Sequence, residues 1–462
     1  MPSNRLKAAF LALLLLISCC FGGCLSAEDE AVLAPAALPD NLDPQLCEGE
    51  TASFIVRHLF EGLTVQTPDG IAPGAAESWT VSSDGLTYTF TLRPDASWAD
   101  GEPVTADDFV FAFNRLFDPS TGSEAAADYL AISGASERLA GEEVPIGVRA
   151  EGEDTVVFTL RAPDREFLSL LSLPAASPCR EDFFRETHGR YGLSLGDILG
   201  NGRFILSTWD GEYIRLRGRG EDEGTVIRLE PGAEATVYWE EAEAGDYTRA
   251  YGILFNQSVP LFSSEAVRQA LAADLPESVS RPETALSPGL REGLGTVKLP
   301  ELAIDAALYR SGSAGNEAEG LTVLIPEDEA LSRLFSDVAQ LWQRDFGLYL
   351  AVETLPEAEL MERVEAGDYD CAVLSLPADF AGPGRALETA AALGRVGDEA
   401  LHSLLSEARQ NDGKADSLYT EAEQLFLDSG AFIPLMTASF ALQTGGFPAV
   451  SLANGAISFS RG

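Results

Sequence analysis

Strict alternation of apolar and polar residues predicts a β-hairpin early in the chain. Residues 86–92 read Leu-Thr-Tyr-Thr-Phe-Thr-Leu and directly follow Asp84-Gly85. Successive side chains of a strand point to opposite faces, and an Asp-Gly pair favours a tight turn. The pattern therefore predicts a half-buried strand whose hairpin partner includes Trp79 and Val81.

A helix is predicted shortly after this hairpin. Thr105 is followed three residues later by Asp108, a spacing typical of a capping box at a helix N-terminus. Phe109, Phe113 and Leu116 then recur at the spacing of one helical face. We expect the helix to pack through this apolar stripe.

The C-terminal half shows a different order of elements, in which strands alternate with amphipathic helices. This βαβαβ order favours a parallel sheet covered by helices, so we expect an α/β fold. The predicted elements are a strand at 321–325, a helix at 327–345, a strand at 348–352, a helix at 357–365 and a strand at 369–374.

Composition and charge narrow the function classes. The 462 residues are 45% hydrophobic, and 73 acidic against 31 basic residues give a net charge of -42. Such a chain can bury a large core, but it lacks the basic footprint that phosphate backbones require, so a nucleic acid partner is not expected. His58, His188 and His402 lie far apart in sequence, and no motif typical of a metal site or a cofactor site occurs. We expect no metal, no cofactor and no catalysis.

The N-terminus has the pattern of an export signal. Arg5 and Lys7 precede the apolar run 8–17, which is too short to span a bilayer. Cys19 follows Leu-Ile-Ser, which resembles the lipobox of bacterial lipoproteins and implies lipidation of that cysteine, with Cys24 as the alternative. Ordinary secretion with free cysteines is the other interpretation.

Three cysteines follow downstream, at Cys47, Cys179 and Cys371. An odd number permits at most one intramolecular pair, so the sequence leaves open whether two of them form a disulfide. Three small buried side chains are the simpler interpretation.

Consecutive sequence blocks resemble one family. They read NLDPQLCEGETASFIVRHLFEGL, then IAPGAAESW, then SSDGLTYTFTLR, then WADGEPVTADDFVF, with NGRFILSTW and LFNQSVPLFSSEAVRQAL further on. In order and content they are similar to the family 5 extracellular solute-binding proteins, the oligopeptide, dipeptide and nickel receptors of ABC importers.

The resemblance implies a two-lobed, periplasmic-binding-protein-like fold of class II, of the large three-domain type, which closes on its ligand. It implies a hinge at Phe255, Asn256, Leu435 and Met436. The implied divisions are a signal peptide at 1–18, a tether at 19–40, domain I at 41–62, 170–256 and 436–462, domain II at 63–169, and domain III, the second lobe, at 257–435.

The resemblance also implies a ligand site between the lobes. Glu48, Gly49 and Glu50 stand where peptide-binding members pair with an extended ligand backbone. Asp379, followed by Phe380, stands where such members bind the peptide's α-amino group, because a buried ammonium needs a carboxylate partner. Leu376 replaces the tryptophan usual at its motif position, which points to an altered pocket. Arg385 is a further candidate, for a ligand carboxylate, with an ordinary surface arginine as the alternative.

These observations predict a monomeric solute-binding protein that captures a peptide or similar small solute and delivers it to an ABC permease. It would sit at the outer face of the cytoplasmic membrane, extracellular or periplasmic, held by a lipid anchor only. The alternatives are a degenerate member that senses a ligand for a partner protein, and a member that binds a nickel chelate or haem.

Overall fold

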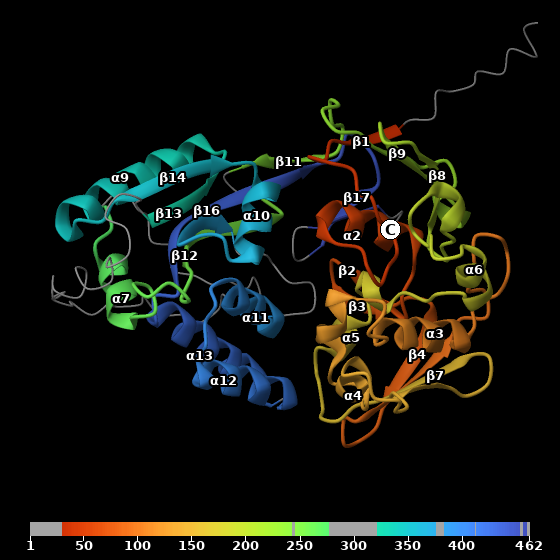
Figure 1. The fold of residues 1–462 in the computed structure, drawn as a ribbon. Helices are drawn as coiled ribbons and strands as arrows, with labels where there is room; N and C mark the ends of the chain where they lie inside the picture. The colour runs from red at the N-terminus through yellow and green to blue at the C-terminus, as the bar shows by residue number, and fades with distance from the viewer. Residues whose placement is uncertain are drawn as a thin grey trace, which may run out of the picture.

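The chain forms two lobes that face each other, as the computed structural model shows (Figure 1). The structure describes residues 30–242, 245–276, 321–375, 383–411, 413–452 and 456–459. Within these ranges, the first lobe comprises residues 30–237 and 444–459, and the second lobe comprises residues 238–443.

The first lobe combines two four-stranded sheets with two hairpins and short helices. One sheet has the order β1-β10-β9-β8 and the other the order β4-β5-β7-β6, while β2 pairs with β3 and β17 with β18. The strands are β1 (Glu30–Leu33), β2 (Thr64–Thr67), β3 (Gly70–Pro73), β4 (Ala76–Val81), β5 (Thr87–Leu92), β6 (Val148–Ala150), β7 (Thr155–Thr159), β8 (Phe204–Trp209), β9 (Ile214–Gly218), β10 (Val226–Leu229), β17 (Ala449–Ser451) and β18 (Ile457–Phe459). The helices are α2 (Gly49–Leu59), η1 (Glu124–Tyr129), α3 (Ala106–Leu116), α4 (Ala135–Leu139), α5 (Phe167–Leu170), η2 (Pro174–Ala176), α6 (Glu181–Glu186), η3 (Leu195–Asp197) and η4 (Gly220–Asp222).

The predicted hairpin is confirmed as β4 and β5. Trp79 lies opposite Phe90 and Val81 opposite Tyr88, and β5 buries alternate residues. The turn places Gly85 in the left-handed region, with φ of 70°, which glycine adopts without strain. β5 then pairs with β7 on its other side, so the alternation marks a central strand with one buried face.

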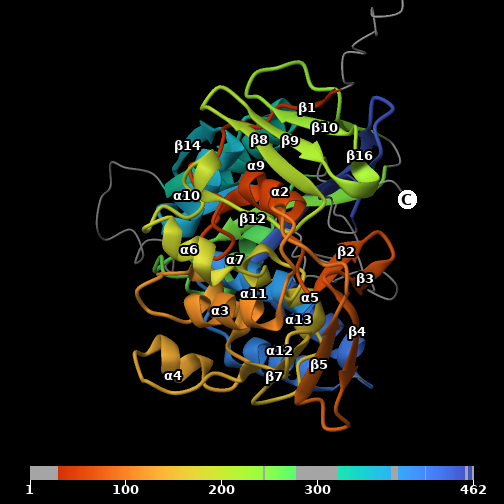
Figure 2. The same cartoon turned by 90° about the vertical axis from the view of Figure 1, so that its right-hand side faces the viewer.

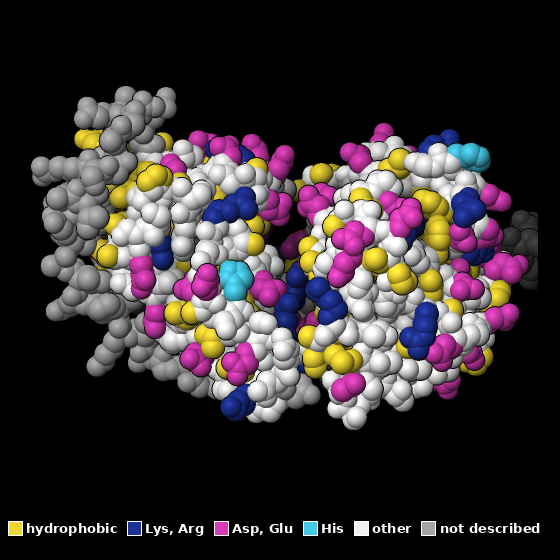
Figure 3. Space-filling model, turned by 60° about the horizontal axis from the view of Figure 1, so that its bottom comes forward, with side chains coloured by type: hydrophobic (Ala, Val, Ile, Leu, Met, Phe, Trp, Pro, Cys, Tyr) yellow, Lys and Arg dark blue, Asp and Glu magenta, His cyan; other side chains and the backbone are white. Residues whose placement is uncertain are grey.

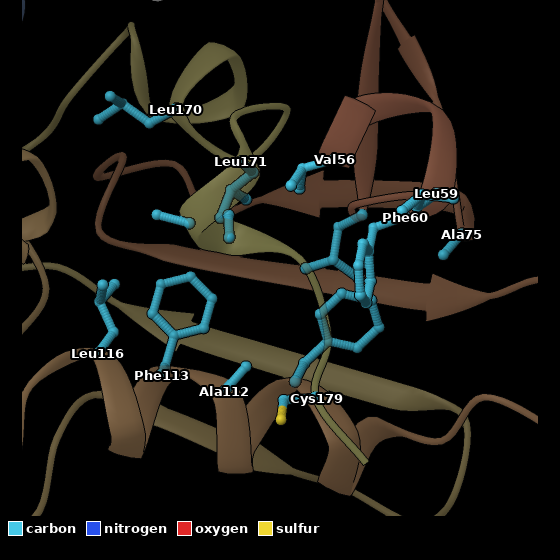
Figure 4. Close-up of a cluster of buried hydrophobic side chains, with 14 of the residues drawn as sticks. Val56, Leu59, Phe60, Ala75, Ala112, Phe113, Leu116, Leu170, Leu171 and Cys179 are labelled. Atoms are coloured by element: carbon cyan, nitrogen blue, oxygen red, sulfur yellow. The ribbon is translucent and has the colours of Figure 1, made fainter. Parts of the chain in front are cut away.

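The predicted capping box is also present, at the start of α3. The backbone N–H of Thr105 donates to Asp108 at 2.9 Å, and the indole N–H of Trp98 donates to the same carboxylate at 3.2 Å. Phe113 of the apolar stripe is fully buried, and Figure 4 shows it beside Leu171, which follows α5. The stripe thus packs helix α3 into the core of the first lobe.

The C-terminal tail returns to the first lobe and is fixed there by His58 of α2. The imidazole Nδ1 lies 2.7 Å from the Phe54 carbonyl, and Nε2 accepts a hydrogen bond from the backbone N–H of Phe459. Burial lowers the pKa of His58 to about 4, so the ring is neutral and can accept at Nε2. This histidine therefore has a structural role.

The second lobe is built on a six-stranded mixed sheet with the order β11-β16-β12-β15-β13-β14. The predicted βαβαβ unit is confirmed, since β13 pairs in parallel with both β14 and β15. The strands are β11 (Tyr238–Glu241), β12 (Tyr247–Phe255), β13 (Leu321–Pro326), β14 (Leu350–Leu355), β15 (Cys371–Ser375) and β16 (Phe432–Gln443). The helices are α7 (Glu265–Ala273), α9 (Glu329–Phe346), α10 (Glu357–Ala366), α11 (Pro383–Leu393), α12 (Glu399–Gln410) and α13 (Ala415–Asp428).

Helices cover both faces of this sheet. Along β13, Val323 belongs to a buried cluster with Trp342 of α9, whereas the next residue, Leu324, belongs to a cluster with Leu387 of α11 and Leu405 of α12. A strand that is buried on both faces has a nearly continuous run of apolar residues, which explains the sequence of 321–325.

The described chain passes between the lobes at two neighbouring places. The backbone N–H of Val237 still bonds to the carbonyl of Val32 in β1, at 3.1 Å. β11 begins at the next residue and pairs with the end of β16, Tyr238 opposite Gln443, after which Phe447 packs against the first-lobe core. β11 and β16 form a two-stranded connection, visible at the top of Figure 1.

The four residues expected at the hinge lie elsewhere. Phe255 pairs with Cys371 inside the six-stranded sheet, and Asn256 donates from its side chain to the Tyr369 carbonyl at 2.9 Å. Leu435 and Met436 lie in the middle of β16. Strands β11 and β12 and residues 436–443 of β16, which the sequence assigned to domain I, therefore belong to the second-lobe sheet. The domain boundary that the sequence placed at 256 coincides with the end of strand β12 at Phe255.

Candidate functional site

The surface where the two lobes meet is the candidate site. Viewed from below, the space-filling surface shows a crevice between the two halves of the molecule, with basic and acidic side chains on both sides of it (Figure 3). The second-lobe helices α10 to α13 lie on the side of the sheet that faces the first lobe (Figures 1 and 2).

Glu48, Gly49 and Glu50 are exposed and lie at the start of α2. Gly49 has a φ of 79°, a left-handed conformation in which the chain turns into the helix. The position of Glu48 near the second lobe follows from its effect on Glu365 of α10. The pKa of Glu365 is raised by partial burial and by the carboxylates of Glu124 and Glu48 in the first lobe. Like charges from both lobes thus face each other here.

Arg385 does not point freely into solvent. Its guanidinium forms an ion pair with Asp128 of η1, in the first lobe, and lies 3.9 Å from Glu388 of its own helix. Both side chains of the cross-lobe pair are largely buried, with exposed fractions of 18% and 22%. Arg385, which the sequence suggested for binding a ligand carboxylate, is therefore already paired with a carboxylate of the chain itself.

Glu166 makes a second cross-lobe contact, which the sequence did not indicate. The backbone N–H of Gly384, in the first turn of α11, donates to Glu166 Oε1 at 3.1 Å. Arg409 Nε of α12 lies 3.4 Å from Glu166 Oε2. Burial raises the pKa of Glu166 to about 7, and Arg409 opposes part of this shift. Glutamates are abundant in this chain, and nothing in the local sequence distinguishes Glu166 from the others.

Asp379 and Phe380 lie outside the described residues, as do Cys19 and Cys24. Their predicted roles stay predictions.

The downstream cysteines are unbonded. Cys47, Cys179 and Cys371 are all free thiols, and burial raises the pKa of each, that of Cys47 and of Cys179 to about 12. Cys179 touches the guanidinium of Arg115, which is ion-paired to Asp43 at 2.5 Å in the first-lobe core. The simpler interpretation, small buried side chains, fits this packing.

The described ranges hold neither a candidate metal site nor a candidate membrane span. They contain no group of three or more His, Cys, Asp or Glu side chains placed to hold a metal ion. They also contain no helix with the length and apolar character needed to cross a membrane.

Comparison with known proteins shows which family the chain resembles. Residues 70–219 match the profile of bacterial extracellular solute-binding proteins, family 5, middle segment. The periplasmic oligopeptide-binding protein OppA of Escherichia coli (strain K12) is 25% identical over 461 residues, which cover 86% of this chain and 84% of OppA. The chain is therefore similar to the family 5 extracellular solute-binding proteins.

Solved structures of this family share the two-lobed fold. The substrate-binding domain of an oligopeptide ABC transporter from Bacillus anthracis str. Ames superimposes with a TM-score of 0.73 at 21% identity, covering 94% of this chain and 98% of that one.

A second structural comparison concerns the arrangement of the lobes. The Escherichia coli murein tripeptide binding protein MppA gives a TM-score of 0.70 at 20% identity, covering 94% of this chain and 100% of that one. The unliganded open form of MppA gives only 0.60 at 21% identity, with 95% and 98% covered. Because the protein compared is the same, the lower score shows that the lobes here are arranged less like those of the open form.

Proposed function

We propose that this protein captures a peptide between its two lobes and delivers it to the permease of an ABC importer. The observation that carries the proposal is the two-lobed arrangement. Within the described residues, the chain passes between the lobes only through β11 and β16, and charged residues of both lobes meet across the crevice. A ligand that contacts both lobes stabilises the closed form relative to the open one. Capture and release then follow from rotation about the two-stranded connection.

The ligand class rests on the relatives. OppA and MppA are named for binding oligopeptides and a murein tripeptide, and peptide is the class we propose here. In this proposal Asp379 takes the ligand's α-amino group, with Phe380 beside it, and Glu48 to Glu50 contact the ligand at the first-lobe side. The exposure of these glutamates next to the second lobe supports that part of the proposal.

Arg385 has a different role in this proposal from the one its sequence position suggested. Arg385 can bind a ligand carboxylate only after its ion pair with Asp128 has broken, because the Asp128 carboxylate already occupies the guanidinium. We therefore place Arg385 among the residues that hold the lobes together.

A thermal unfolding screen tests the ligand class. The chain from residue 25 onward is heated with pools of di- to octapeptides, with nickel chelates and with haem. A ligand specific to the folded state stabilises it by about 2.7 kcal/mol at one hundred times Kd. We expect a shift with peptides that disappears on N-acetylation and in Asp379→Ala. Asp337→Ala, at an exposed position of α9, is the matched control and keeps the shift.

Other outcomes of the screen would indicate a different ligand or a different function. A shift with a nickel chelate or haem alone replaces the peptide by that cargo. No shift with any pool contradicts import and favours the degenerate sensor. Uptake of a labelled peptide by cells with and without the chain then tests delivery to the permease.

We also propose that the chain is exported and lipidated at Cys19, and so held at the outer face of the cytoplasmic membrane. Metabolic labelling with a palmitate analogue tests the anchor. We expect Cys19→Ala to abolish the label and Cys24→Ala to leave it. The opposite pattern moves the anchor to Cys24, and label in neither wild type nor variant contradicts lipidation.

A further inference from the structure

The lobes touch at a second place, far from β11 and β16. Figure 1 shows the two-stranded connection at the top of the molecule, whereas α11, α12 and α13 approach α5 of the first lobe at the bottom. Cross-lobe polar contacts gather at this lower edge. We call the residues that make them the interlobe latch: Asp128, Arg165 and Glu166 of the first lobe, and Gly384, Arg385, Arg409 and Asp416 of the second.

The centre of the latch is the carboxylate of Glu166, which is 5% exposed. It accepts from the N–H of Gly384 in the first turn of α11, where backbone N–H groups have no partner within the helix and favour a negative charge. The guanidinium of Arg409 lies on its other oxygen, at 3.4 Å, and is itself bound by Glu388 at 2.5 Å. The second lobe thus presents a backbone N–H and a guanidinium to the carboxyl group of Glu166, which belongs to the first lobe.

Position 384 must be a glycine for this contact to form. A Cβ on Gly384 would lie 2.7 Å from Tyr419 Cε1 and 3.0 Å from Glu166 Oε1. Either distance is closer than van der Waals contact permits, so α11 approaches Glu166 only because no side chain intervenes.

Three further contacts surround the centre. Asp128 forms an ion pair with Arg385, as described above. The backbone N–H of Arg165 donates to the carbonyl of Arg409 at 3.2 Å, and the Arg165 guanidinium lies 3.5 Å from Asp416. A main-chain hydrogen bond requires the two segments to approach closely, so the lobes are in direct contact here.

The first-lobe half of the latch is held rigidly. Asp164 accepts from the backbone N–H of Glu166 at 2.9 Å, and its own carbonyl accepts from the hydroxyl of Tyr88 in β5 at 3.0 Å. Residues 164–166 are thus fixed to the β4-β5-β7-β6 sheet before they meet the second lobe, which reduces the entropy lost when the lobes join.

We propose that the interlobe latch holds the two lobes closed in the absence of a ligand, and that the cleft opens by breaking it. The closed form is then populated before binding. A ligand that needs the closed form binds with an apparent Kd equal to its intrinsic Kd divided by the closed fraction. The latch therefore sets affinity without touching the ligand.

The groups around Glu166 make the latch responsive to pH. The groups that face Glu166 are Arg409 of α12, Tyr419 of α13 and Asp164 of its own turn. Glu388 of α11 is paired with Arg409, and Arg385 of the same helix lies near Glu388. Burial raises the pKa of Glu166 to about 7 and also raises that of Asp164. Closing the latch therefore takes up protons, and acid favours the closed form.

Small-angle X-ray scattering of the ligand-free chain from residue 25 onward tests the proposal, since it needs no ligand and stays independent of the proposed cargo. We expect the wild type to scatter as the closed arrangement, and Gly384→Ala and Glu166→Ala to show a larger radius of gyration. Gly397→Ala is the matched control, because a Cβ there meets no atom within 4 Å. Unfolding midpoints establish that each variant is folded.

A charge exchange separates the latch from a general packing defect. Asp128→Arg and Arg385→Asp each leave two like charges across the crevice and should open the lobes, while the double exchange should restore the compact form. The proposal is overturned if the wild type already scatters like Glu166→Ala, or if the double exchange stays as open as the single ones.

Discussion

The lobes meet at two charged regions. At one of them opposite charges face each other, and at the other like charges do. In the interlobe latch, carboxylates of the first lobe lie against guanidinium groups and a helix N-terminus of the second. At the other region, which we call the acidic rim, Glu48 and Glu124 of the first lobe face Glu365 of α10. One region attracts the lobes and the other repels them.

This difference indicates how a chain with a net charge of -42 can still close. Long-range repulsion between two acidic lobes is screened beyond about 10 Å at 0.1 M salt, so the short-range contacts decide the balance. The latch is largely buried and keeps its strength, whereas the acidic rim is exposed and contributes little. Each prediction below weakens one of these two regions.

The largest effect is expected from Arg409→Met. At pH 8, where Glu166 is largely ionised, this change leaves its buried carboxylate without the guanidinium, and removing one partner of a buried ion pair costs about 3 kcal/mol or more. We expect the closed form to become about a hundredfold less populated. Hydrogen exchange at the amides of Arg165 and Gly384 measures this directly, because both donate across the crevice.

Arg333→Met is the matched control for this prediction. Arg333 pairs with Glu329 on the exposed surface of α9, where a salt bridge contributes at most about 1 kcal/mol. Unchanged exchange at both amides in Arg409→Met would show that the latch does not hold the lobes.

The next effect is a dependence on pH. The pKa of Glu166 in the closed form, about 7, lies above its usual value of 4.5, so its contribution to closure is fully present below about 4.5. The contribution is lost as the pH rises through about 7. We expect the radius of gyration to increase between pH 5 and pH 8.5.

Glu166→Gln tests the assignment of this pH dependence. The amide keeps an oxygen for the Gly384 N–H but carries no charge, so the variant should stay compact over the whole pH range. A wild-type profile that persists in Glu166→Gln would assign the titration to Asp164 or to another group.

Much of the fold could be predicted from the sequence, because local patterns determine it. Alternation along β5, the Thr105 capping box and the βαβαβ order each reflect contacts within a short stretch of chain. The hinge could not be predicted in the same way. Phe255 ends strand β12 and Leu435 and Met436 lie within β16, so the expected hinge positions belong to strands of the sheet, and no local pattern marks where the chain passes between the lobes.

The latch also could not be predicted, for a different reason. Its two halves are separated by more than 200 residues, as in the contact of Gly384 with Glu166, and each residue taken alone is an ordinary surface type. Arg385 was singled out for a ligand carboxylate, and the structure pairs it with the carboxylate of Asp128. The sequence thus indicated the chemistry of this side chain but not the origin of its partner.

A smaller effect is expected when the acidic rim is neutralised. Glu365→Gln removes the second-lobe charge that faces Glu48 and Glu124, so the closed form should gain stability. Because Glu365 is exposed, the gain should stay below about 1 kcal/mol. It is best measured in Glu166→Ala, whose weakened latch leaves the lobes free to respond, as a decrease in radius of gyration. An increase would show that the rim does not repel.

The smallest effect is expected from salt, and it should have opposite signs in two variants. In Glu166→Ala the latch is weakened, so the exposed acidic rim has more influence than in the wild type. Because 1 M salt screens the rim to within about 3 Å, added salt should favour closure slightly. In Glu365→Gln the rim is weakened and the latch dominates, so added salt should leave the lobes unchanged or open them slightly through the less buried Arg165 and Asp416 pair. Scattering curves at 0.05 M and 1 M salt distinguish the two cases. If both variants respond with the same sign, the attraction and the repulsion are not separated between these two regions.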